Sequence, residues 1–100
     1  MKFILKKGDP TENIYNSLRN IGYRFQEKDE KNSEFIFIRP LHKIGYPRFH
    51  LYVKNMEEKL IFDLHLDQKK PIYKGAHAHS GEYEGEILEK EVKRIKENLL

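Results

Sequence analysis

The sequence contains no cysteine and no long hydrophobic run. Without cysteine the chain can form neither a disulfide framework nor a thiolate metal site, and it suits a reducing compartment. The opening segment MKFILKK has three consecutive apolar residues before two lysines, which is far shorter than the apolar stretch of a signal peptide. Nothing else approaches the length of a membrane span. We therefore expect a soluble, cytoplasmic protein without a membrane partner.

Length and composition limit what can fold. One hundred residues, of which 38% are hydrophobic and 12% aromatic, can supply one domain with one core. Charged residues make up 35% of the chain and leave a formal net charge of +3. No internal repeat or linker divides the sequence. We expect a single α+β domain over residues 1–100.

Apolar periodicity predicts five short strands and two helices in the order β-α-β-β-β-β-α. Alternating or short apolar segments between turn residues indicate strands, and apolar residues three or four apart indicate helices. The predicted fold is an antiparallel four- to five-stranded sheet with two helices packed on one face. The predicted strands cover residues 2–6, 23–28, 34–39, 48–54 and 59–67, and the last helix begins near residue 82 or 86.

Start and stop signals frame the first helix. Asp9 is the predicted N-cap, Pro10 suits the first helical position, and Glu12 completes a capping box. Gly22 is expected to end the helix.

Two neighbouring strands, 48–54 and 59–67, each separate an apolar face from a polar one. A hairpin closing through residues 55–58 would place His50 beside Asp63 and Arg48 beside His65. The same register would pair apolar residues throughout, as Val53 with Leu60, Leu51 with Phe62 and Phe49 with Leu64. A register shifted by two residues keeps both faces intact.

Basic and aromatic residues alternate in the middle of the chain and favour a nucleic-acid-binding function. No acidic residue occurs between Glu34 and Glu57. A tyrosine beside cationic side chains on a sheet face is typical of proteins that bind RNA or single-stranded nucleic acid. The candidate nucleic-acid-binding residues are Arg39, Lys43, Arg48, His50, Tyr52, Lys54, Lys69 and Lys70.

Histidines and aspartates at alternate positions suggest a second hypothesis, a divalent metal site with hydrolase activity. Imidazole and carboxylate groups suit zinc, iron or manganese, and alternate residues of a strand point to one side. The candidate ligands are His50, Asp63, His65, Asp67, His77 and His79.

A metal-free alternative uses the same side chains to cleave RNA. A histidine oriented by a carboxylate can act as a general base, and His50 beside Asp63 would fill that role. The other roles would fall to His65 or His79 as the acid, and to Arg48 or Lys70 as the group that stabilises the phosphorane.

Surplus apolar surface favours a further alternative, a protein-interaction or homo-oligomeric module. Ile61, Tyr52 and the segment EFIFI at residues 34–38 offer more apolar surface than two helices cover. On this hypothesis the partner is another protein or a second copy of the chain.

Overall fold

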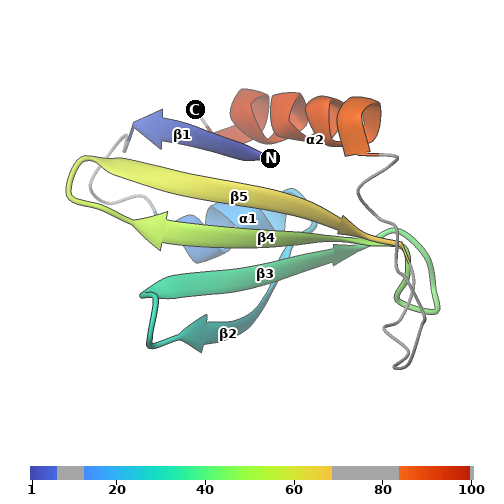
Figure 1. Cartoon of the computed structure of the whole chain (residues 1–100), viewed down its shortest axis with the longest axis horizontal. Coiled ribbons are helices and arrows are strands. Elements are labelled where there is room, and N and C mark those ends of the chain that lie inside the picture. The colour runs from blue at the N-terminus through green and yellow to red at the C-terminus, as the bar shows by residue number, and fades with distance from the viewer. Residues whose placement is uncertain (7–12, 69–83, 100) are drawn as a thin grey trace.

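The computed structural model describes residues 1–6, 13–68 and 84–99. These residues form a five-stranded antiparallel sheet and two helices in the predicted order (Figure 1). No helix in these ranges is long and apolar enough to cross a membrane. The elements are β1 (Lys2–Lys6), α1 (Ile14–Asn20), β2 (Arg24–Asp29), β3 (Glu34–Pro40), β4 (Arg48–Asn55), β5 (Lys59–Asp67) and α2 (Glu84–Leu99).

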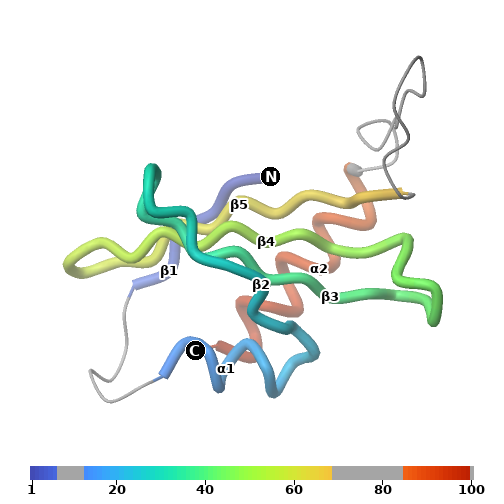
Figure 2. Tube along the Cα trace, turned by 90° about the horizontal axis from the view of Figure 1, so that it is seen from below, coloured from blue at the N-terminus to red at the C-terminus, as the bar shows by residue number. Residues whose placement is uncertain are grey.

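The strands lie in the order β1-β5-β4-β3-β2. Strands β2 to β5 follow one another as antiparallel neighbours, whereas β1 pairs with β5 and therefore lies at the opposite edge from β2 (Figure 1). Helix α1 lies to one side of the strands (Figure 2). β4 and β5 are interior strands, so each is paired with a neighbouring strand along both of its edges. This pairing holds the orientation of their two faces.

One face of the sheet forms the core. Alternate residues of the strands are buried there, as the two-residue period of a strand requires. Both helices add apolar side chains to the same buried cluster. Burying these groups provides the main driving force for folding, at roughly 25 cal/mol for each Å² of apolar surface. The cluster includes Phe3, Leu5, Leu18, Phe37, Phe49, Leu51, Val53, Phe62, Leu64, Leu66, Leu88 and Ile95.

The predicted register of β4 and β5 was wrong by two residues. Val53 pairs with Phe62 rather than with Leu60, and Leu51 with Leu64 rather than with Phe62. The reason is the turn. The backbone N–H of Met56 donates a hydrogen bond to the carbonyl of Lys59 at 2.9 Å, so only two residues remain in the loop. Two-residue loops are the commonest hairpin connections, and a shift by two positions leaves every side chain on its predicted face.

The prediction of Asp9 as the cap of the first helix was also wrong. The N-cap is Asn13, whose side-chain oxygen accepts hydrogen bonds from the backbone N–H groups of Tyr15 and Asn16. Asp9, with the rest of residues 7–12, lies outside the described residues. Gly22 follows the helix as predicted, with a φ of +103° that favours glycine.

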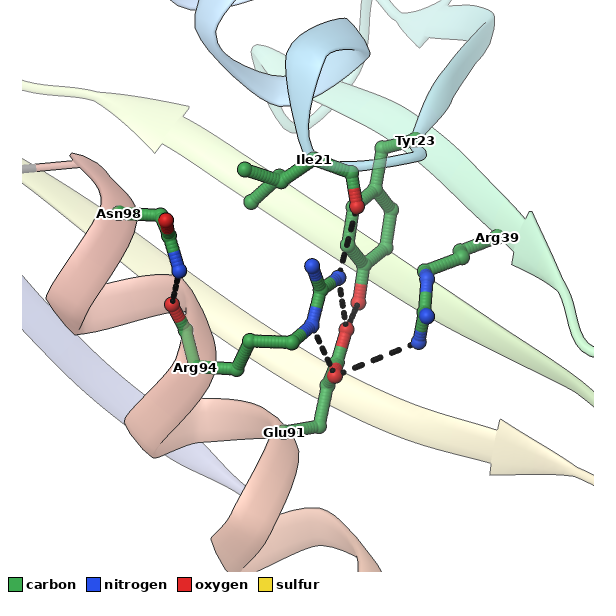
Figure 3. A network of polar contacts seen from close by, with 6 residues as sticks. All are labelled: Ile21, Tyr23, Arg39, Glu91, Arg94 and Asn98. Carbon is green, nitrogen blue, oxygen red and sulfur yellow. Dashed lines mark hydrogen bonds and ion pairs between the residues drawn. The ribbon is translucent and has the colours of Figure 1, made fainter.

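A buried carboxylate ties α2 to the rest of the fold. Glu91 is only 4% exposed, and three side chains donate to it (Figure 3). Tyr23 Oη lies 2.7 Å from Glu91 Oε2, Arg94 Nε lies 2.8 Å from Oε1, and Arg39 Nη1 lies 3.4 Å from Oε1. Arg94 also donates to the carbonyl of Ile21 at 2.8 Å. The cluster thus joins α2, the end of α1 and β3 at one point.

This environment changes how the groups ionise. Burial, together with the negative charge of Glu91, raises the pKa of the Tyr23 hydroxyl far above its ordinary value. The hydrogen bonds from Arg94 to Glu91 raise the pKa of the guanidinium. Tyr23 therefore remains a neutral donor and Arg94 a cation, which is the combination that the Glu91 carboxylate requires.

We expect Glu91→Ala to reduce the free energy of unfolding by about 3 kcal/mol, because it leaves a partly buried arginine and a buried hydroxyl without their acceptor. Tyr23→Phe removes one donor and keeps the ring, so it should cost about 1 kcal/mol. Urea denaturation measures both. Glu97→Ala is the matched control, since Glu97 is an exposed residue of the same helix. Equal stability of the Glu91→Ala and Glu97→Ala variants would contradict the anchoring role.

Candidate functional site

The sheet surface opposite the core carries a cluster of polar and aromatic side chains, called here the polar face. It consists of alternate residues of β4 and β5, because the intervening residues point into the core. No described helix covers this surface. Its members are Arg48, His50, Tyr52 and Lys54 of β4 and Ile61, Asp63, His65 and Asp67 of β5.

Strand pairing determines which of these residues meet. Arg48 stands opposite Asp67, His50 opposite His65, and Tyr52 opposite Asp63. The sequence had predicted His50 beside Asp63 and Arg48 beside His65, and the two-residue shift of register changes both pairs. Each aspartate therefore lies directly across from a cation or a tyrosine rather than across from a histidine.

Both aspartates are engaged by positively charged or N–H-bearing groups. Asp67 Oδ2 lies 3.1 Å from Arg48 Nε and 3.2 Å from His50 Nδ1. Asp63 Oδ2 lies 3.2 Å from His65 Nε2, and its Oδ1 lies 3.3 Å from the α-amino group of Met1. The carboxylates thus serve to orient neighbouring side chains, and each lies close to one cation, Arg48 for Asp67 and the α-amino group of Met1 for Asp63.

Rings and cations alternate across the same surface. The Tyr52 ring lies 4.8 Å from that of His50 and 5.6 Å from that of His65, measured between centroids. The Arg48 guanidinium lies 4.6 Å from the centroid of the Tyr46 ring, which is cation–π geometry. The His65 side chain is 48% exposed. The face therefore presents flat, partly accessible rings beside positive charge.

Two pKa shifts follow from these contacts. The hydrogen bond from His50, and then that from Arg48, hold the pKa of Asp67 below its ordinary value in spite of partial burial. Partial burial raises the pKa of Tyr52, and the negative charges of Asp67, Glu34 and Asp63 add to the effect. At neutral pH the face accordingly holds an ionised Asp67 and a protonated Tyr52 hydroxyl.

The two ring nitrogens of His50 differ in their contacts. With Nδ1 directed at Asp67, the buried Nε2 has no hydrogen-bond partner among the described residues. A carboxylate-held imidazole is the arrangement that general bases use. The orienting carboxylate is Asp67, so the predicted His50–Asp63 pair was wrong in its second member. Asp63 orients His65 instead.

Arg39 lies on the opposite side of the sheet from the polar face. It pairs with Phe49, whose side chain is buried in the core, and it contacts Glu91. Its place could have been inferred, because Arg39 lies two positions from the buried Phe37 and residues two apart on a strand share a face.

The remaining candidates fall outside the polar face. Lys43 is exposed in the loop between β3 and β4, close in sequence to Tyr46, which is not among the candidate binding residues. Among the described residues, no group of three or more histidine or acidic side chains is placed to hold a metal ion. Four predicted site residues lie outside the described residues: Lys69, Lys70, His77 and His79.

Comparison of the chain with protein-family models, curated proteins and solved structures finds no match. Function must therefore be inferred from the side chains themselves.

We expect acid to destabilise the protein partly through Asp67. A carboxyl group with a folded pKa below its unfolded value stabilises the native state above the unfolded pKa, and loses that effect as pH falls through the folded pKa. Urea denaturation of the natural protein and of Asp67→Asn, from about pH 6 to about pH 3, measures this contribution. The natural protein should lose more stability below about pH 4 than the variant does. Parallel stability curves would show that Asp67 contributes nothing.

Proposed function

We propose that the polar face binds single-stranded nucleic acid, with RNA as the first candidate. The observation that carries the proposal is the cluster around Tyr52, in which a tyrosine and two histidines lie ring against ring on a sheet surface that no described helix covers. Aromatic side chains on a sheet face stack unpaired bases without requiring a particular sequence. The nearby cations would contact the phosphates.

Positive charge lies on both sides of the rings. Lys54 occupies one end of β4 and makes no ion pair within the described part of the chain, and Arg48, which is paired with Asp67, occupies the other end. Lys43 is exposed in the adjoining loop. A strand rises about 3.3 Å per residue, so the six-residue step from Arg48 to Lys54 covers about 20 Å.

The two aspartates of the polar face do not prevent this function. Carboxylates repel phosphate, but Asp67 is paired with Arg48 and His50, and Asp63 with His65. The guanidinium of Arg48 balances the charge of Asp67, and the α-amino group of Met1 lies 3.3 Å from Asp63 Oδ1. The net charge of +3 then favours approach of a polyanion at low salt.

We expect the protein to bind labelled single-stranded RNA in fluorescence anisotropy at about 50 mM salt, and to bind it more weakly at about 200 mM. Tyr52→Ala should raise Kd by about 5- to 150-fold, the effect of losing one stacked base, whereas Tyr52→Phe should keep most of the affinity. Lys54→Gln should weaken binding. It should also reduce the slope of log K against log salt by about the contribution of one phosphate contact.

Lys90→Gln is the matched control, because Lys90 is an exposed lysine on α2, away from the polar face. Absence of binding at low salt, or equal losses from Lys54→Gln and Lys90→Gln, would refute the proposed interface. Duplex RNA and single-stranded DNA of the same length would establish which form is preferred.

RNA cleavage is a second candidate function, favoured by the two adjacent histidines that each direct one nitrogen at a carboxylate. In this reaction one imidazole takes the proton of a ribose 2′-hydroxyl, the oxygen attacks phosphorus, and the other imidazole protonates the departing 5′-oxygen. Incubation with RNA and with its 2′-O-methyl counterpart, in the presence of chelator, tests it. Cleavage of RNA alone that His65→Asn abolishes and His42→Asn leaves intact would establish the activity, and intact RNA would exclude it.

A further inference from the structure

Strand β2 forms one edge of the sheet. It pairs with β3 on one side and has no other strand as neighbour among the described elements. Arg24 to Lys28 are all exposed. An edge strand offers unpaired backbone N–H and C=O groups to any strand that can match it.

The side chains of β2 divide between the two sheet faces. Arg24 and Glu27 lie opposite Ile38 and Ile36, and Asp29 lies opposite Glu34, all on the side of the polar face. Phe25 and Lys28 lie opposite Phe37 and Phe35 on the helix side. Gln26 is the extra residue of a bulge, since the register shifts between Phe25 and Glu27.

We propose that two copies of the chain dimerise by antiparallel pairing of their β2 strands about a two-fold axis. In the register that we propose, called here the matching register, Arg24 lies opposite Asp29 of the second copy, Phe25 opposite Lys28, and Gln26 opposite Glu27. The two-fold axis repeats each pair, so two Arg24–Asp29 pairs form on the polar side. Opposite charges directly across an antiparallel pair are stabilising.

The pattern of faces selects this register. Moving one strand by a single residue would place Arg24 opposite Lys28, which carries the same charge and points to the other face. In the matching register the bulges of the two β2 strands lie opposite each other at the two-fold axis. On both sides of the axis, each residue therefore stays opposite a residue that points to the same face of the sheet.

Exposed aromatic surface at this edge would be covered in the dimer. Phe25 is 46% exposed and Tyr15 is 36% exposed, and their ring centroids lie 5.3 Å apart. The stem and ammonium of the second copy's Lys28 would pack on Phe25. A contact of this kind already exists within the chain, where Lys28 Nζ lies 5.6 Å from the centroid of the Phe35 ring.

The other edge of the sheet is unsuited to the same pairing. If β1 paired centrally with a second β1, Lys2 would stand opposite Lys6 twice. Like charges directly opposite are destabilising. The charges therefore favour β2 over β1, and a closed dimer over an open chain of sheets.

Pairing through β2 keeps both polar faces on the same side of one ten-stranded sheet, because residues opposite one another in an antiparallel pair share a face. The proposal does not depend on what the polar face binds.

Charge reversal tests the dimer directly. The natural protein should show a dimer fraction that rises with concentration in sedimentation equilibrium. Arg24→Asp and Asp29→Arg should each weaken self-association by about 10- to 100-fold, because two attractive pairs become repulsive. A mixture of the two variants should regain dimerisation, since each then carries the charge that the other lacks.

Asp29 also accepts hydrogen bonds from the backbone N–H groups of Lys31 and Asn32 in the adjoining turn, so circular dichroism must confirm that Asp29→Arg folds. A second measurement avoids this residue. The chain has no cysteine, and Gln26→Cys, next to the two-fold axis, should form an intermolecular disulfide on mild oxidation. Ile4→Cys, on the β1 edge, is the control. A natural protein that stays monomeric at high concentration, or cross-linking of both cysteine variants to the same extent, would overturn the proposal.

Discussion

The pairing of β4 with β5 is the interaction on which the rest of the structure depends. Its register buries Phe49, Leu51 and Val53 against apolar partners on one face. The same register brings histidines, tyrosine and aspartates together on the other face. Because successive side chains of a strand alternate between faces, the core and the polar face are two results of a single alignment. A substitution that disturbed the alignment would damage both.

The strands and their faces could be predicted because apolar and polar side chains alternate along the sequence with the two-residue period of a strand. The register could not, because it depends on how many residues the turn contains, and Glu57 and Glu58 carry no glycine or asparagine signal. The cap at Asn13 was missed for a similar reason. Asp9, Pro10 and Glu12 matched a capping box, and local sequence does not decide between competing caps.

The buried cluster shows what single-residue patterns can miss. Glu91 lies three positions after Leu88 and one before Val92, so it belongs to the apolar stripe of α2, although it carries a charge. A charged residue in such a stripe indicates a buried partner, and Arg39 and Tyr23 supply two. This pairing gives Arg39 a structural role on the side of the sheet opposite the polar face.

The strand order has a consequence for how the chain folds. Strands β2 to β5 pair through short connections, so each hairpin can form from nearby residues. β1 instead pairs across more than fifty residues, with Phe3 opposite Phe62. Closing so long a loop carries the largest entropic cost in the sheet, which places this pairing late in folding. Until β1 arrives, the outer edge of β5 is exposed, and β5 carries half of the polar face.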